Sequence, residues 1–199
     1  MEFDYFPTLP HESDVLLRHL LLPRGTEVLE PCSGRGDLVR ALRAARLRVR
    51  TNELNPRWPA EFRYDISVLE SWTKLPRVDW IVMNPPFNQI NVIAPLALYH
   101  AGRGLAMFAR LTWLEVAKGR RNWMAACSRW MRLLIFMPKV LYFLDHGPDM
   151  VGRIWIVWDK RHRGETRVIW DDWKSASWLD PRYDYQKYEE INAIKEESK

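Results

Sequence analysis

Residues 27–46, EVLEPCSGRGDLVRALRAAR, contain the pattern that decides the fold. Residues 27–30 are predicted to form a short strand, and residues 31–36, with two glycines, a turn. In residues 37–46 apolar side chains recur at helical spacing with arginines between them, which indicates an amphipathic helix. A strand, a turn and a helix in this order form the repeating unit of a parallel sheet covered by helices.

Segments of the same two kinds alternate along the rest of the chain, so we predict an α/β fold. Residues 167–170 are expected to pair with the late strand 153–158 across the basic turn 159–166. One domain, residues 1–170, is expected, followed by a polar and partly disordered tail, residues 171–199. Strands are predicted at 47–53, 78–83, 104–109, 133–137 and 153–158, and further helices at 11–22, 90–100 and 113–132, the last interrupted near Gly119.

Composition limits the classes of function. The 199 residues carry a formal charge of +5, mainly from arginine, which mildly favours nucleic acid as a partner. No apolar run approaches the ~20 residues that cross a bilayer, and no secretory signal precedes the domain, so we expect no membrane partner and a cytoplasmic location. Cys32 and Cys127 are far apart and no histidine cluster accompanies them, so we expect reduced thiols and no metal site.

Two acidic residues end neighbouring predicted strands, at the edge where open α/β sheets bind ligands. Glu30 precedes the turn that contains Gly34 and Gly36, and Glu53 ends the next strand, where a carboxylate can accept both hydroxyl protons of a ribose. NAD is the obvious competitor, but the turn lacks the third glycine of GxGxxG and Glu30 would repel a pyrophosphate. The charge of Glu30 instead suits an ammonium group, so the pattern favours a zwitterionic, sulfonium-bearing ligand.

The tetrapeptide Asn84-Pro85-Pro86-Phe87 follows an apolar strand, and its two prolines fix a rigid, extended backbone. An exocyclic amine on an aromatic ring is planar and poorly nucleophilic. The side-chain oxygen of Asn84 and a neighbouring backbone carbonyl can accept its two protons, while Phe87 stacks on the ring. Taken alone, the tetrapeptide is equally compatible with a strand-ending turn that places Phe87 in the core.

With these motifs in this order, residues 5–160 resemble the class I S-adenosylmethionine-dependent methyltransferases, and more narrowly the N6-adenine DNA methyltransferases with the gamma-type motif order. The resemblance implies a Rossmann-like, three-layer α/β/α fold around a seven-stranded sheet whose last strand is antiparallel. It assigns the ribose to Glu53-Leu54, the adenine amino group to Asp65-Ile66, and catalysis to Asn84, Pro85, Pro86 and Phe87. The implied S-adenosylmethionine contacts are Phe6, Thr8, Glu30, Cys32, Gly34, Gly36, Glu53, Leu54, Asp65, Ile66 and Asn84.

The resemblance implies methylation of adenine N6 in DNA by direct transfer to a flipped-out base, by an enzyme of a bacterium or of a phage in its host's cytoplasm. No separate target-recognition domain fits after the catalytic motif, so we expect short or relaxed sequence preference. Adenine in RNA, cytosine N4 and protein glutamine remain alternative substrates, and a non-catalytic binding module on the same fold is a further alternative. Loop residues expected to contact phosphates, each also compatible with an ordinary surface charge, are Arg120, Arg121, Lys160, Arg161 and Arg163.

Overall fold

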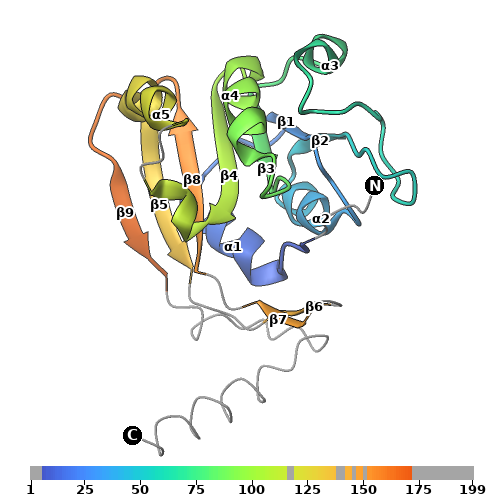
Figure 1. Cartoon of the computed structure of the whole chain (residues 1–199), viewed down its shortest axis with the longest axis horizontal. Coiled ribbons are helices and arrows are strands. Elements are labelled where there is room, and N and C mark those ends of the chain that lie inside the picture. Colours follow the sequence, from blue (N-terminus) through green and yellow to red (C-terminus); the bar gives the residue numbers. More distant parts are fainter. Residues whose placement is uncertain (1–5, 116–118, 138–141, 145–146, 150–151, 172–199) are drawn as a thin grey trace, which may run out of the picture.

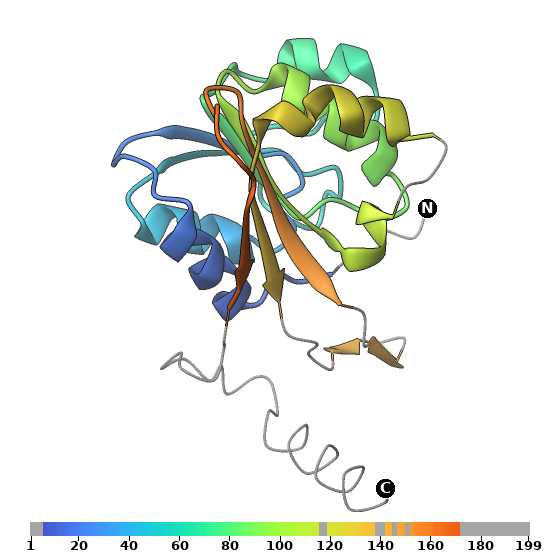
Figure 2. The same cartoon turned by 90° about the vertical axis from the view of Figure 1, so that its left-hand side faces the viewer.

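The computed structural model describes residues 6–115, 119–137, 142–144, 147–149 and 152–171, and their central feature is one seven-stranded sheet. Helices lie on both faces of this sheet, as Figure 1 and the edge-on view of Figure 2 show. The predicted three-layer α/β/α fold is confirmed. One face carries α1 (Pro10–His19) and α2 (Asp37–Ala44), and the other carries α3 (Leu69–Lys74), α4 (Ile90–His100) and α5 (Arg121–Cys127).

The strands of the sheet follow the order β2-β1-β3-β4-β8-β5-β9, and β8 runs antiparallel to its neighbours β4 and β5. The chain moves from β1 outward to β2 and then returns to β3 on the other side of β1. The strand order therefore reverses between β1 and β3, and open α/β sheets bind ligands at such a reversal. The strands are β1 (Glu27–Glu30), β2 (Arg48–Thr51), β3 (Trp80–Met83), β4 (Gly104–Arg110), β5 (Met131–Met137), β8 (Arg153–Asp159) and β9 (Arg167–Trp170).

The position of β9 corrects one prediction. Residues 167–170 were expected to pair with 153–158, but β9 pairs with β5 in parallel. Both edges of β8 are already occupied by β4 and β5, so no edge remains for β9. The antiparallel strand is thus β8, and the chain then adds one further parallel strand at the edge of the sheet.

The region predicted as one helix, 113–132, contains several short elements instead. A 3-10 helix spans Leu111–Leu114, α5 spans Arg121–Cys127, a second 3-10 helix spans Ser128–Trp130, and β5 begins at Met131. The rings of Trp113 and Trp123 both pack against Trp158 of β8, so contacts with the sheet override the helical pattern. Helix α3 and a small hairpin of β6 (Tyr142–Leu144) and β7 (Gly147–Asp149) were not predicted.

Tryptophan provides much of the core. Trp80, Trp155 and Trp158 are fully buried, and the indole nitrogen of Trp155 donates to the backbone oxygen of Glu12 at 2.7 Å, which fastens α1 to the sheet. Gly104 begins β4 against Trp158, and a Cβ there would lie 2.4 Å from the Trp158 backbone oxygen. The sheet is therefore closely packed on both faces.

The end of β9 is joined to α1 through Asp171. The carboxylate of Asp171 accepts hydrogen bonds from Arg18 and His19 at 2.7 and 3.0 Å. The remainder of the predicted tail, 172–199, lies outside the described residues. Within the described part of the chain, no helix has the length and apolar character needed to span a bilayer.

Candidate functional site

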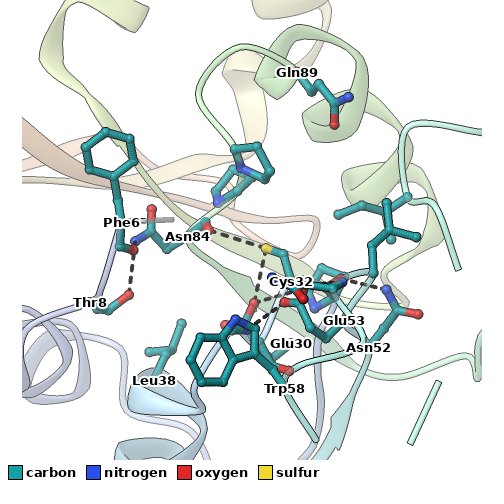
Figure 3. A pocket seen from close by; sticks show the side chains of 18 of the residues that line it. Phe6, Thr8, Glu30, Cys32, Leu38, Asn52, Glu53, Trp58, Asn84 and Gln89 are labelled. Carbon is teal, nitrogen blue, oxygen red and sulfur yellow. Dashed lines mark hydrogen bonds between the residues drawn. The ribbon is translucent and has the colours of Figure 1, made fainter. Parts of the chain in front are cut away.

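A cleft opens at the carboxyl ends of β1, β2 and β3, where the strand order reverses (Figure 3). Segments far apart in the sequence form its walls, from the N-terminal residues to the segment after β3. Gly36 is the one predicted cofactor residue that does not line the cleft; it has a φ of 81° at the start of α2, which suits glycine. The predicted residues that do line it are Phe6, Thr8, Glu30, Cys32, Gly34, Glu53, Leu54, Asp65, Ile66, Asn84, Pro85 and Pro86.

Glu30 supplies a buried carboxyl group to the cleft. Its Oε1 accepts hydrogen bonds from the backbone N–H and the thiol of Cys32 at 3.2 and 3.3 Å. Its Oε2 is buried and has no hydrogen-bond partner among the described residues. Burial raises the pKa of Glu30 to about 8, the charge of Glu53 adds to this rise, and the Cys32 hydrogen bonds oppose it. A cationic group entering the cleft would satisfy Oε2 and stabilise the carboxylate.

Cys32 connects Glu30 to the tetrapeptide. Its thiol donates to Glu30 and also lies 3.4 Å from the backbone oxygen of Asn84. Burial, followed by the charge of Glu30, raises the pKa of this thiol well above its usual value. Because a thiolate is the reactive form of cysteine, Cys32 has the properties of a structural residue and not of a nucleophile.

Glu53 fixes the loop after β1 to the end of β2. Its Oε2 accepts from the backbone N–H of Gly34 at 2.7 Å, and its Oε1 accepts from that of Asn55 at 2.8 Å. Each carboxylate oxygen can accept a further hydrogen bond, so the group can also hold hydroxyls of a ligand. Asp65, which also lines the cleft, accepts from the backbone N–H and the hydroxyl of Ser67 through one oxygen, Oδ1.

The side chain of Asn84 is held in one orientation. Its Nδ2 donates to the backbone oxygen of Phe6 at 3.0 Å and to the hydroxyl of Thr8 at 3.1 Å (Figure 3). Two acceptors on the same side of the amide determine which atom is the nitrogen. Its Oδ1 is buried and has no partner among the described residues. Asn84, which lines the cleft, therefore holds a fixed acceptor without a donor among the described residues.

Phe87 differs from its neighbours in the tetrapeptide, because it lines a second cavity and not the cleft. Its ring lies 4.9 Å from the ring of Phe6 and 4.9 Å from the guanidinium of Arg110, and the guanidinium of Arg153 lies at 5.9 Å. Arg110 and Arg153 are direct partners across β4 and β8. The sequence left open whether this ring stacks on a ligand or packs in the core, and the structure shows it half-buried between a phenylalanine and two arginines.

The predicted phosphate contacts are not brought together. Arg120 lines the second cavity, whereas Arg121 is exposed at the start of α5 and lines neither cavity. The group Lys160, Arg161 and Arg163 follows β8, whose last residue pairs with Gly104 at the amino end of β4. The two ends of β4 are separated by about 20 Å, since a strand rises ~3.3 Å per residue. The basic turn therefore lies near the amino end of β4, at the end of the sheet opposite to the cleft.

Several residues at the site were missed by sequence reasoning. Asn52 is fully buried and joins the two walls of the cleft: its Nδ2 donates to the Pro31 and Tyr64 backbone oxygens, and its Oδ1 accepts from the Tyr64 N–H. A buried asparagine between Thr51 and Glu53 has no periodic signal that marks it. Trp58 lines the cleft as well, and nothing separates it in sequence from the tryptophans of the core.

The donors and acceptors of the cleft match S-adenosylmethionine. The unbonded Oε2 of Glu30 suits its ammonium group, Glu53 its ribose and Asp65 its adenine amino group. The side chain of Leu54 is 41% exposed beside Glu53, which leaves apolar surface for a ring. Among the described residues, no three His, Cys, Asp or Glu side chains form a group that could hold a metal ion.

Comparisons with known proteins bear on the fold. No protein-family model matches the sequence, and neither does any curated protein. Among solved structures, a modification subunit of a putative type I restriction enzyme from Vibrio vulnificus has a TM-score of 0.65 at 11% identity, covering 96% of this chain and 53% of its own. The type I methyltransferase subunit from Streptococcus thermophilus has a TM-score of 0.60 at 15% identity, with coverage of 96% and 52%.

This chain has the class I methyltransferase fold. A putative RNA methyltransferase from Pyrococcus horikoshii is also similar, with a TM-score of 0.54 at 16% identity over 75% of this chain and 81% of that one. At such identities the likeness shows the fold alone. The chain spans about half the length of the two restriction-modification subunits. The class I fold places the cleft at the edge of the sheet where Glu30, Glu53 and Asn84 meet.

Proposed function

We propose that this chain binds S-adenosylmethionine and transfers its methyl group to the N6 amino group of adenine in DNA. The observation that carries the proposal is the side chain of Asn84. Its Nδ2 donates to Phe6 and Thr8, and its Oδ1 is buried without a partner among the described residues. A buried acceptor without a partner costs stability, and an amino group of a substrate would remove that cost.

Three carboxyl groups would hold the cofactor. Glu30 would bind its ammonium group, Glu53 its ribose hydroxyls and Asp65 its adenine amino group, with Leu54 and Ile66 providing apolar contact. When bound, S-adenosylmethionine supplies an electrophilic methyl group on a sulfonium. The hydrogen bonds from Gly34 and Asn55 to Glu53 fix this carboxylate before the ligand arrives, so less order has to be created on binding.

The tetrapeptide would prepare the acceptor nitrogen. Oδ1 of Asn84 accepts a hydrogen bond from one N–H of the amino group. A backbone carbonyl of the rigid Pro85-Pro86 segment accepts a hydrogen bond from the other N–H. Both acceptors draw the amino group out of conjugation with the base and direct its lone pair at the methyl group. As the nitrogen–methyl bond forms, the sulfur–methyl bond breaks and leaves a neutral thioether. The nitrogen then releases one proton to water, and no covalent bond to the enzyme forms. The inert thiol of Cys32 agrees with this direct route.

Two observations support DNA as the substrate. The charge of +5 favours a polyanion, and the restriction-modification subunits are among the proteins of similar fold. Adenine in RNA, cytosine N4 and the glutamine amide offer the same planar nitrogen to Asn84. A binding module without catalysis would need Glu30 and Glu53 but would have no use for the unbonded oxygen of Asn84.

Mass spectrometry of nucleosides tests the proposal. The purified chain and S-adenosylmethionine are incubated with unmethylated DNA and, separately, with unmethylated RNA. We expect N6-methyladenine in the DNA, and none with Asn84→Ala, whose affinity for S-adenosylmethionine in calorimetry should change little. A mark confined to RNA or to cytosine would overturn the substrate, and retained activity in Asn84→Ala would overturn the mechanism. A chain that fails to bind S-adenosylmethionine would overturn both.

A further inference from the structure

A second cavity adjoins the cleft on the far side of the tetrapeptide. Phe87 lies in its wall, and Asn88 lines both the cleft and this cavity, so the two spaces meet at the segment after β3. The described lining contains two guanidinium groups and no carboxylate. The residues of the second cavity are Phe87, Asn88, Ile90, Asn91, Arg110, Thr112, Trp113 and Arg120.

Arg120 is fixed in this wall by neutral oxygens. Its Nε and one terminal nitrogen donate to the backbone oxygen of Glu115 at 3.1 and 2.9 Å, and the same terminal nitrogen lies 3.3 Å from the backbone oxygen of Thr112. The guanidinium also lies 5.6 Å above the ring of Trp113. Carbonyl groups hold the side chain in place but do not cancel its charge. The cavity therefore has a preorganised positive wall.

Asn91 adds neutral donors to this charge. Its Oδ1 accepts from the indole nitrogen of Trp113 at 2.9 Å and from Arg120 at 3.3 Å. With the oxygen used by two donors, the amide is oriented and its Nδ2 hydrogens are left for a ligand. The hydroxyl of Thr112 is a further donor in the lining. A cavity with positive charge and several N–H and O–H donors suits an anion with several acceptor oxygens.

We propose that the second cavity binds a backbone phosphate of the nucleic acid, next to the nucleotide whose base lies at Asn84. This inference rests on the proposed function, because it requires a nucleic-acid substrate. A phosphate carries acceptor oxygens in a compact tetrahedral group, and Arg, Asn and Thr side chains are common protein contacts to it. The contact places the strand relative to Phe87 and carries no sequence information, which agrees with relaxed sequence preference.

Neutralising single phosphates gives a direct test. The substrate is a short single-stranded DNA with one adenine, prepared as a set in which one phosphate at a time is replaced by an uncharged methylphosphonate. For the natural chain we expect kcat/KM to fall roughly ten- to hundredfold at one position beside the adenine and little elsewhere, as for the loss of a hydrogen-bonded charge. A set in which no position stands out would overturn the proposal.

Two arginines, one inside the cavity and one outside it, provide a matched pair of variants. On the unmodified oligonucleotide, Arg120→Gln should have a kcat/KM as low as that of the natural chain on the sensitive methylphosphonate. For the Arg120→Gln variant, the methylphosphonate at that position should cause no further loss. Arg129→Gln removes the same charge from an exposed side chain outside the cavity, and should behave like the natural chain. Equal losses in the two variants would mean that charge in general, and not this cavity, attracts the strand.

Arg120 also supports the chain around Thr112, so Arg120→Gln could lose activity by misfolding. A third variant therefore changes the charge of the cavity and keeps these hydrogen bonds. Asn91→Asp keeps the oxygen that accepts from Trp113 and Arg120, so the fold is retained, but it places a negative charge in the cavity. We expect unchanged S-adenosylmethionine affinity and a loss of kcat/KM of at least tenfold, since a carboxylate repels a phosphate. Unimpaired transfer in Asn91→Asp would overturn the proposal.

The failure of this proposal can be separated from failure of the proposed function. The fluorescence anisotropy of the same labelled oligonucleotides measures binding without methyl transfer. Position-dependent binding that is lost in Arg120→Gln would support the phosphate site even if no DNA were methylated. Methylation of DNA without any position-dependent loss would overturn the phosphate site and leave the proposed function standing.

Discussion

Replacing Glu30 by glutamine should change how stability depends on pH. Burial raises the pKa of Glu30 to about 8 from an ordinary value of 4.5. Between these two values the folded protein holds a proton that the unfolded chain has lost. Stability therefore falls as pH rises through this window and levels off above pH 8. The Glu30→Gln variant has an uncharged group of the same shape at this position, so it should lack this part of the pH dependence.

The size of the effect follows from the pKa difference. Each pH unit in the window costs about 1.4 kcal/mol of unfolding free energy, so the natural chain should lose about 3 kcal/mol between pH 5.5 and pH 8 because of Glu30. Other groups titrate in both proteins, and the difference between the two curves removes their contribution. Urea denaturation followed by tryptophan fluorescence at pH 5.5, 7 and 8.5 measures it. Parallel curves for the two proteins would refute the assignment of a protonated, buried Glu30.

The same protonation predicts a signature of cofactor binding. At pH 7 the free carboxyl of Glu30 is mostly protonated, and it should release its proton when the ammonium of S-adenosylmethionine lies beside Oε2. Calorimetry in phosphate and in Tris should give different apparent binding enthalpies, because the two buffers take up protons with different heats. Glu30→Gln should bind more weakly and show no buffer dependence. Equal enthalpies for the natural chain in both buffers would show that Glu30 does not change its charge on binding.

Three further predictions concern other parts of the structure. Thr8→Val removes one of the two acceptors that orient Asn84 and should lower kcat about tenfold with little change in S-adenosylmethionine affinity, whereas Thr8→Ser should restore turnover; equal rates in both variants would contradict this role. Gly104→Ala should lower the unfolding free energy by about 3 kcal/mol, because its Cβ would lie 2.4 Å from a backbone oxygen, while Gly119→Ala, with nothing within 4 Å, should change little in urea denaturation. Arg161→Gln should leave DNA affinity and its salt dependence unchanged, because Arg161 lies at the end of the sheet opposite to the cleft. If the slope of log affinity against log salt concentration became shallower by about 1, Arg161 would contact a phosphate.

Local patterns explain which parts of the fold could be predicted. The helix at 90–100 and the strand-turn-helix unit at 27–46 depend on periodicity and on turn residues, which are visible in short windows. The edge of the sheet that carries the cleft also follows from local order, since ligand-binding residues end successive parallel strands. Glu30, Glu53 and Asn84 could therefore be expected near one another before any contact was known.

Long-range pairing explains what could not be predicted. The partner of β9 depends on which strand edges are still free, and this is decided by β4 and β5 together. The contact between Arg110 and Arg153 is set by the antiparallel register of two strands that are more than forty residues apart. Likewise, the orientation of the Asn84 amide depends on Thr8, which is 76 residues earlier in the chain. Composition and periodicity carry no information about such pairs.

The unbonded atoms of the cleft favour an enzyme over a scaffold. Within the part of the chain that the structure describes, Oε2 of Glu30 and Oδ1 of Asn84 are both buried without a partner, and Cys32 contacts both residues. The other polar atom of each side chain makes structural hydrogen bonds, but the unbonded atom costs stability unless a ligand satisfies it. The two atoms also require different partners: the carboxyl oxygen of Glu30 suits a cation, and the amide oxygen of Asn84 suits a neutral N–H. A site that offers both acceptors, on two residues joined by one thiol, fits the proposed transfer of a group between two ligands.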